Sequence, residues 1–274
     1  AENVLRGKAI GLFFEKPSTR TWVSFDVGIS SMGGKIVYLG PESIQLGVRE
    51  PIKDIARVLA RYLDGAVLRT FKHETVEEFA TYFKKPVING LTDKAHPAQA
   101  LADFLTLKEN FKSLKGLTLA YIGDGNNVLN SLLFMAAKVG THLHYACPKG
   151  YEPEKELLER VQKIAKSKDT RIQGFATPEE AVKGAQAIYT DVWVSMGEEK
   201  IAAEKRDHFK GFQINDELLK HAEKGAIVLH CLPAHRGEEI TEEVLESWAS
   251  RVFDQAENRL HVQKAVLAHL FGKL

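Results

Sequence analysis

The sequence has few cysteines, no long apolar run and almost no excess of either charge. Only two of its 274 residues are cysteines, Cys147 and Cys231, and they lie far apart in the chain. This excludes the disulfide framework of small secreted domains and fits a reducing compartment. No apolar stretch reaches the roughly 20 residues of a membrane-spanning helix, and no signal-peptide pattern is present. We therefore expect a cytoplasmic protein without membrane contact.

The charge balance gives no electrostatic reason to expect a polyanionic partner. Lysine and arginine total 37 and aspartate and glutamate 36, so the formal net charge is +1. Binding to nucleic acid or to an anionic membrane usually shows as a basic excess, so neither partner is expected. An anion-binding site in this protein must be local. The 44% of hydrophobic residues is enough for a sizeable core.

Short apolar runs alternate with helical patterns along the whole chain. The apolar runs predict strands at residues 9–14, 35–39, 65–68, 87–88, 118–122, 142–146, 172–175, 187–190, 211–214, 226–230 and 251–253. Helical patterns lie between most of them, at 51–63, 76–83, 97–110, 128–139 and 153–168. Continuously apolar strands that alternate with helices are typical of parallel sheets covered on both faces. An open sheet rarely holds more than about 10 strands, so we predict an α/β fold of two doubly wound parallel-sheet domains, divided near residues 108–116.

A strand, a turn and a helix start follow one another near the beginning of the chain. The run from Ile10 to Phe14 is apolar, and Ser18 and Thr19 are good N-cap residues for the helix that follows. A helix N-terminus can bind an anion, and Arg20 can give a phosphate or carboxylate two parallel hydrogen bonds. An ordinary capped helix with a solvated arginine explains the same residues and stays open as the alternative.

Three further polar residues lie at the end of a predicted strand or at the start of a predicted helix. Arg69 ends the apolar run 65–68, and the carboxyl ends of parallel strands are where α/β proteins place ligands. His96 and Gln99 lie three residues apart across a helical turn that Pro97 opens, so both can face one ligand. A solvated arginine and a simple helix cap are the alternatives.

The glycine-rich run 123–127, Gly-Asp-Gly-Asn-Asn, stands between a strand and a helix, where a dinucleotide-binding fingerprint would lie. Val128 occupies the position of the third glycine, and the next strand ends in Cys147-Pro148 and lacks a ribose-binding acid. This disfavours a dehydrogenase. The asparagines suit hydrogen bonding to an amino acid.

Two motifs follow later predicted strands. Asp191 could pair with an ammonium group or cap the next turn, and Ser-Met-Gly at 195–197 resembles a mobile loop. The run His230-Cys231-Leu232-Pro233 has three interpretations. A zinc site of His230, Cys231 and His235 lacks a fourth ligand, a nucleophilic cysteine lacks a triad, and a buried inert cysteine is the commonest case.

Together these motifs resemble the aspartate/ornithine transcarbamylase family, most closely its ornithine members. The matching motifs are Phe-Glu-Lys-Pro-Ser-Thr-Arg-Thr, His-Pro-x-Gln, Gly-Asp-Gly-Asn-Asn, Asp-x-x-x-Ser-Met-Gly and His-Cys-Leu-Pro, and they extend over nearly the whole chain. The resemblance implies a carbamoyl-phosphate-binding domain at 1–110, an ornithine-binding domain at 111–255 and a C-terminal helix at 256–274 that packs back on the first domain. Family members usually have a helical segment before the first strand, so we expect this chain to lack an N-terminal piece.

The resemblance also implies an activity and its residues. The carbamoyl group would pass from carbamoyl phosphate to the δ-amine of L-ornithine, giving L-citrulline and phosphate, without metal or organic cofactor. The residues implied for carbamoyl phosphate are Ser18, Thr19, Arg20, Thr21, Gln45, Arg69, His96, Gln99, Cys231, Leu232 and Arg259. Those implied for ornithine are Asn127, Asp191, Ser195, Met196 and Cys231. Arg20, His96 and Cys231 are expected to be catalytic, and the proton acceptor is either the leaving phosphate or Cys231 with Asp191.

Similar enzymes are trimers whose sites are shared, so we expect a homotrimer or a multiple of trimers in which Gln45 reaches a neighbour's carbamoyl phosphate. A role in arginine biosynthesis is expected, with arginine breakdown as the alternative. One departure is Trp22, which stands where many members have a second arginine.

Two other functions stay open, a transcarbamylase for putrescine or an acylated ornithine, and a catalytically silent binding protein. In the last helix, Val262, Ala265, Val266, His269 and Leu270 form the expected core face.

Overall fold

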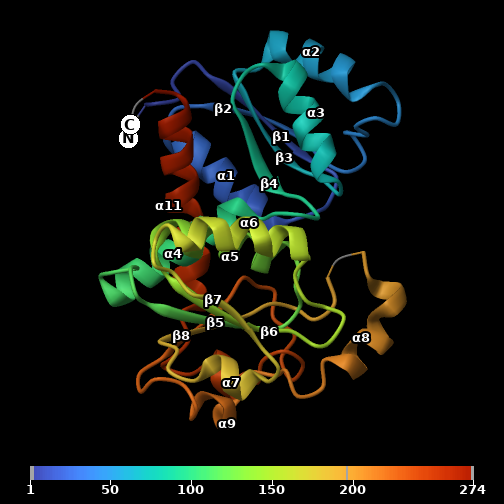
Figure 1. Cartoon of the computed structure of the whole chain (residues 1–274). Helices are drawn as coiled ribbons and strands as arrows, with labels where there is room; N and C mark the ends of the chain where they lie inside the picture. The colour runs from blue at the N-terminus through green and yellow to red at the C-terminus, as the bar shows by residue number, and fades with distance from the viewer. Residues whose placement is uncertain (1–2, 196, 273–274) are drawn as a thin grey trace. The chain divides into compact units, whose positions relative to one another are not determined.

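The computed structural model describes residues 3–195 and 197–272 and divides into two compact units. The first unit comprises Ala1–Ala102 together with Glu257–Leu274, and the second comprises Asp103–Ala256. Each unit is built on its own parallel sheet, as the alternation of apolar runs and helices predicts (Figure 1).

The first unit alternates strands and helices. Its elements are β1 (Ala9–Phe14), α1 (Thr19–Ser31), β2 (Lys35–Leu39), α2 (Ile52–Tyr62), β3 (Gly65–Arg69), α3 (His73–Phe83) and β4 (Val87–Leu91). The strands pair in parallel in the order β2-β1-β3-β4. Because α1 connects β1 to β2 on one side and β3 returns to the other side of β1, the topological switch point lies between β1 and β3.

Both faces of this sheet are covered. Leu12 and Phe14 pack with α1 and the C-terminal helix α11 (Val252–Leu270), whereas Phe13 packs with α2 and α3. Successive side chains of a strand point to opposite faces, so the continuous apolar run of β1 reflects burial on both. The C-terminal helix packs on the first unit, as the resemblance implies.

The second unit repeats the architecture with a longer sheet. Its elements are β5 (Thr118–Ile122), α5 (Asn127–Val139), β6 (His142–Ala146), α6 (Lys155–Lys166), β7 (Ile172–Phe175), α7 (Pro178–Val182), β8 (Ala187–Thr190), η1 (Glu199–Ile201), α8 (Ala202–His208), α9 (Asp216–Leu219), β9 (Ile227–His230) and α10 (Glu242–Leu245). The parallel order β7-β6-β5-β8-β9 places the switch point between β5 and β8. Helix α4 (Pro97–Phe111) and helix α11 each contain a boundary between the units.

Two of the predicted strands are wrong. Residues 211–214 form no strand, because Gly211 has a φ of +91° and Ile214 makes only an isolated bridge to Ile240. Residues 251–253 lead into α11, whose buried Val252 and Gln255 are spaced by less than one helical turn.

The predicted core face of the last helix is also wrong. Ala265, His269 and Leu270 are exposed. The buried positions of α11 in the first unit are Asn258, Arg259, Gln263, Leu267 and Ala268. Polar side chains therefore occupy much of its buried face, and a hydrophobic pattern does not detect such a face. Within 3–195 and 197–272, no helix combines the length and apolar character needed to cross a membrane.

Candidate active site

The turn after β1 presents a capped helix N-terminus. Ser18 is the N-cap of α1, and its Oγ accepts a hydrogen bond of 3.3 Å from the backbone N–H of Thr21. Thr19 and Arg20 are exposed, whereas Thr21 is buried. The cap leaves further first-turn N–H groups and the positive end of the helix dipole available to an anion.

Two arginines converge on the buried hydroxyl of Thr21. Arg259 donates from Nη2 to Thr21 Oγ1 at 3.1 Å and from Nη1 to Gln99 Oε1 at 2.6 Å. Arg69, at the carboxyl end of β3, donates to the same hydroxyl at 3.5 Å. The four side chains are at most 8% exposed. Two buried guanidinium groups that converge on one hydroxyl concentrate positive charge and hydrogen-bond donors at this point, so the cluster suits a phosphate or a polarised carbonyl.

His96 lies immediately before α4 and belongs to the same buried surroundings. Its burial and the nearby positive charges of Arg259, Arg69 and Arg20 hold its pKa well below the usual range. A neutral imidazole at neutral pH can donate one hydrogen bond without adding charge. Because the charge of Arg20 also lowers the His96 pKa, this exposed arginine lies near the cluster.

Gln45 does not join this cluster. It is exposed in the connection between β2 and α2. Trp22 lies on the exposed side of α1, where its ring stacks on Tyr38 with centroids 4.7 Å apart. Trp22 therefore forms an aromatic stack with Tyr38 on the surface.

In the second unit, Asp191 is the centre of a hydrogen-bond network at the carboxyl end of β8. The Cys231 thiol donates to Asp191 Oδ1 at 2.8 Å, and the backbone N–H of Val192 donates to the same oxygen at 2.8 Å. Asn126 Nδ2 donates to Oδ2 at 2.8 Å. Three donors therefore fix the orientation of a carboxyl group that is 6% exposed, at a strand end where it can accept a hydrogen bond from an ammonium group.

Asn126 has a role that the sequence did not predict, since it both caps a helix and binds Asp191. Its Oδ1 caps α5 by accepting from the backbone N–H groups of Val128 and Leu129, at 2.9 and 3.2 Å. Asn127, predicted for ornithine, is the first residue of α5 and is half-buried. The signal was available, since an asparagine just before a helical pattern is a preferred N-cap and its amide nitrogen remains free to donate.

His230 orients the turn that carries Cys231 and Leu232. Its Nδ1 accepts from the backbone N–H of Leu232 at 2.8 Å, so the proton is on Nε2, which lies 2.9 Å from Glu239 Oε1. Both His230 and Glu239 are fully buried. Leu232 has a φ of +57°, an unusual conformation for leucine that this hydrogen bond helps to maintain.

The alternative zinc set of His230, Cys231 and His235 is not assembled. In the described part of the chain, His230 and Cys231 group with Asp191, whereas His235 groups with Glu238 and Glu239. Both ring nitrogens of His230 already interact with protein groups.

The Ser-Met-Gly motif is only partly described. Ser195 is half-buried, and its backbone N–H donates to Glu198 Oε2 at 2.8 Å. Met196 lies outside the described residues.

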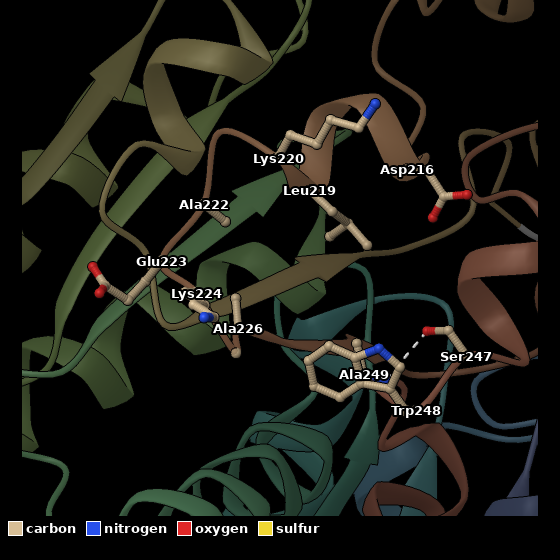
Figure 2. A pocket seen from close by; sticks show the side chains of 11 residues that line it. Asp216, Leu219, Lys220, Ala222, Glu223, Lys224, Ala226, Ser247, Trp248 and Ala249 are labelled. Carbon is tan, nitrogen blue, oxygen red and sulfur yellow. Dashed lines mark hydrogen bonds between the residues drawn. The ribbon is translucent and has the colours of Figure 1, made fainter.

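A pocket of about 360 Å³ lies elsewhere in the second unit. Figure 2 shows Leu219 and Trp248 lining it, with the charged ends of Lys220 and Glu223 directed outward. The lining residues Gly225 and Ala226 precede β9, so this pocket is at the opposite end of that strand from Cys231. It is separate from the candidate site.

Family models for aspartate/ornithine carbamoyltransferase match two consecutive parts of the chain. The carbamoyl-phosphate-binding domain matches residues 1–109, and the aspartate/ornithine-binding domain matches residues 115–270. An ornithine carbamoyltransferase of Prochlorococcus marinus is 54% identical over 270 residues, which cover 98% of this chain and 85% of that protein. One from Methanoculleus marisnigri is 50% identical over 272 residues, covering 99% and 87%.

The solved structures give the same result. The ornithine carbamoyltransferase of Pyrococcus furiosus superposes with a TM-score of 0.97 at 47% identity, covering 100% of this chain and 87% of that one. Both domains are matched, and about half of the residues are identical over nearly the whole chain, so it belongs to the aspartate/ornithine carbamoyltransferase family.

Proposed function

We propose that this chain transfers the carbamoyl group of carbamoyl phosphate to the δ-amine of L-ornithine, producing L-citrulline and phosphate. The relatives named ornithine carbamoyltransferase support this reaction, with 54% and 50% identity over nearly the whole chain. The observation that carries the proposal is the convergence of Arg69 and Arg259 on Thr21 beside a neutral His96. That arrangement suits an anionic substrate with a polarisable carbonyl group.

The phosphate group would bind at the N-terminus of α1 and to two arginines, Arg20 and Arg69. In this assignment Ser18, Thr19 and Thr21 donate from hydroxyl or backbone groups, and Arg20 and Arg69 neutralise charge. Gln45 would complete the site from a neighbouring subunit, in keeping with its exposed position.

The carbamoyl group would be held by different residues. Arg259 and His96 would donate to the carbonyl oxygen, and Gln99 would accept from the amide nitrogen. We also assign Cys231 and the backbone of Leu232 to this group. The bond between Arg259 and Gln99 supports the pairing, because it fixes both side chains before substrate binds.

Ornithine would be held by the loops that follow β5, β8 and β9. Asp191 would pair with the α-ammonium group, with Asn127, Ser195, Met196 and Cys231 as the other contacts. The three hydrogen bonds that orient the Asp191 carboxyl group support this role.

The reaction requires the neutral δ-amine. Its lone pair forms the new carbon–nitrogen bond, and negative charge develops on the carbonyl oxygen near Arg259 and His96. The bond from the carbamoyl carbon to the phosphate oxygen then breaks, and its electron pair leaves with the phosphate beside Arg20 and Arg69. The amine proton passes to the departing phosphate, with Cys231 and Asp191 as the alternative acceptor. Fixed donors aimed at developing charge usually provide the largest contribution to such a rate.

We further propose a homotrimer, or a multiple of trimers, in the cytoplasm, where citrulline would serve arginine biosynthesis. The functional domains proposed are 1–110 for carbamoyl phosphate, 111–255 for ornithine and the C-terminal helix 256–274.

The test is citrulline formation from carbamoyl phosphate with ornithine, with putrescine and N-acetylornithine in parallel. Turnover with ornithine alone is the expected result. Preference for another amine would overturn the assignment of Asp191 to an α-ammonium group. Arg20→Ala should lower activity sharply, and near-normal dependence on carbamoyl phosphate in that variant would show that the phosphate assignment is wrong.

A further inference from the structure

Lys205 of α8 is a buried lysine that bridges two loops. Its side chain is 1% exposed, and its Nζ lies 2.7 Å from Asp124 Oδ2 and 2.6 Å from Glu198 Oε2. A fully buried lysine is uncommon unless its charge is paired. One partner carboxylate follows β5 and the other follows β8, so a single ammonium group connects the two strand ends that flank the switch point.

Each partner carboxylate is also part of the loop that it anchors. Glu198 Oε2 accepts the backbone N–H of Ser195 at 2.8 Å, so the ion pair fixes the position of that backbone. The backbone oxygen of Asp124 accepts from the Tyr121 hydroxyl at 2.9 Å. Two residues later, Asn126 caps α5 and binds Asp191. The connection therefore runs from Ser195, through Glu198 and Lys205, to the loop of Asp124 and Asn126, and the Asn126 side chain binds Asp191.

The surroundings make this connection sensitive to the lysine charge. Burial raises the pKa of Asp124, while the hydrogen bond and charge of Lys205 act in the opposite direction. The Lys205 ammonium also lies 5.5 Å and 5.8 Å from the ring centroids of Tyr151 and Phe209. Without the lysine, two carboxylates would face each other beside apolar rings, and their repulsion would separate the loops.

We propose that Lys205 is a positioning residue that holds Ser195 at a fixed place relative to the Asn126–Asp191 pair, and thereby shapes the site for the amino-acid substrate. This inference rests on the proposed function. Lys205 contacts no substrate in this scheme and acts through Glu198 and Asp124. Its effect should therefore fall on ornithine and spare carbamoyl phosphate.

The kinetic experiment compares Lys205→Met with Lys205→Arg and with Lys210→Met as the matched control. Lys210 pairs with Asp207 on the surface, with the two side chains 77% and 70% exposed, so its loss removes the same charge nearby without touching the loops. Lys205→Met should raise the KM for ornithine at least ~10-fold, equal to the ~1.4 kcal/mol of one lost charge-assisted hydrogen bond. The KM for carbamoyl phosphate should stay within about twofold, because none of the affected bonds reaches its residues. Lys205→Arg should recover most of the loss, and Lys210→Met should match the parent enzyme.

A binding measurement separates this inference from the reaction itself. The chain has three tryptophans, at 22, 193 and 248. In a Trp22→Phe/Trp248→Phe background, Trp193 is the only fluorophore of its type, and its ring lies 5.8 Å from Phe209 in the same loop region. Ornithine should change Trp193 emission in this background. Lys205→Met should raise the ornithine concentration at the midpoint of this change at least ~10-fold.

Several results would overturn the inference. A normal ornithine KM and a normal Trp193 titration in folded Lys205→Met would do so, as would equal losses for both substrates, which indicate a general structural role. If Lys205→Met does not fold, Glu198→Gln replaces it, since it weakens the same bridge at its 34% exposed end and should raise the ornithine KM several-fold. Absence of citrulline formation by the parent enzyme would contradict the proposed function. A Lys205→Met variant with the same ornithine kinetics as an active parent would contradict only this inference.

Discussion

Replacing Arg259 with methionine is the most informative single change in the first unit. The side chain is 4% exposed and donates to both Gln99 and Thr21, at 2.6 and 3.1 Å. Methionine fills a similar volume without charge or donors. The substitution removes one positive charge from the proposed carbamoyl site and takes one donor from each of two buried oxygens, of which Thr21 Oγ1 keeps its bond from Arg69.

The structure sets the size of the expected effects. A hydrogen bond from a charged donor contributes about 1.5–3 kcal/mol, so the loss of two such bonds predicts a loss of stability of roughly 3–6 kcal/mol. Loss of one preorganised donor to a developing oxyanion typically lowers kcat by about 10²–10³. Arg259→Lys keeps the charge but not the two-pronged geometry, so its stability and its activity should both fall between those of the parent and of Arg259→Met.

The assays are urea unfolding followed by circular dichroism, and initial rates of citrulline formation at saturating ornithine. The matched control is Arg57→Met, since Arg57 is an exposed arginine of the same unit whose pair with Asp54 spans 3.4 Å. Exposed pairs contribute at most about 1 kcal/mol, so this control should change stability little and turnover not at all. A folded Arg259→Met enzyme with kcat within about threefold of the parent would refute the role of Arg259 in stabilising developing charge.

Three other predictions concern single groups. Asn126→Ala should lower the free energy of unfolding by about 0.5–2 kcal/mol through loss of the α5 cap, and should raise the ornithine KM through loss of the donor to Asp191; urea unfolding and initial rates measure both. Burial raises the pKa of Cys147, so in the native protein a thiol reagent at pH 8 should modify Cys231 well before Cys147, as peptide mapping would reveal. Burial and nearby arginines lower the pKa of His96, so as pH falls below about 6.5 the unfolded chain binds a proton that the native protein does not, and stability is lost. His96→Gln should therefore flatten the decline of unfolding free energy between pH 6.5 and 5 by up to ~1.4 kcal/mol per pH unit, and an unchanged slope would contradict the neutral imidazole.

Much of the fold follows from the sequence because its central strands are buried on both faces. Continuous apolar runs such as 9–14 and 118–122 are strands with the predicted bounds. The two false strands show where the rule ends. At 211–214 the apolar residues follow a glycine in a left-handed conformation, and at 251–253 a short apolar run belongs to the first turn of a helix. A run of three or four apolar residues carries too little periodicity to separate these cases.

The candidate site was predictable to the extent that it uses strand ends and helix starts. Arg69 is the last residue of β3, Asp191 follows β8 and Ser18 caps α1, so position alone indicates a ligand-binding role. The hydrogen bonds that orient these groups were not predictable. Nothing in the spacing indicates that Asn126 binds Asp191 or that the Lys205 ammonium joins Asp124 to Glu198, because both contacts connect segments far apart in the chain.

The C-terminal helix shows why the hydrophobic pattern fails near a site. An amphipathic helix is recognised by the apolar residues that it buries, yet α11 buries Gln255, Asn258, Arg259 and Gln263 on the way to Leu267. Arg259 occupies a buried position because Thr21 and Gln99 accept its hydrogen bonds. The rule that buried helix positions are apolar fails at Arg259, where a cation is held in place by its hydrogen bonds. Such conflicts between hydrophobic pattern and burial are expected at functional positions. The wrong prediction for α11 therefore draws attention to Arg259. A polar residue on a buried helix face needs hydrogen-bond partners, and those of Arg259 come from segments far away in the sequence.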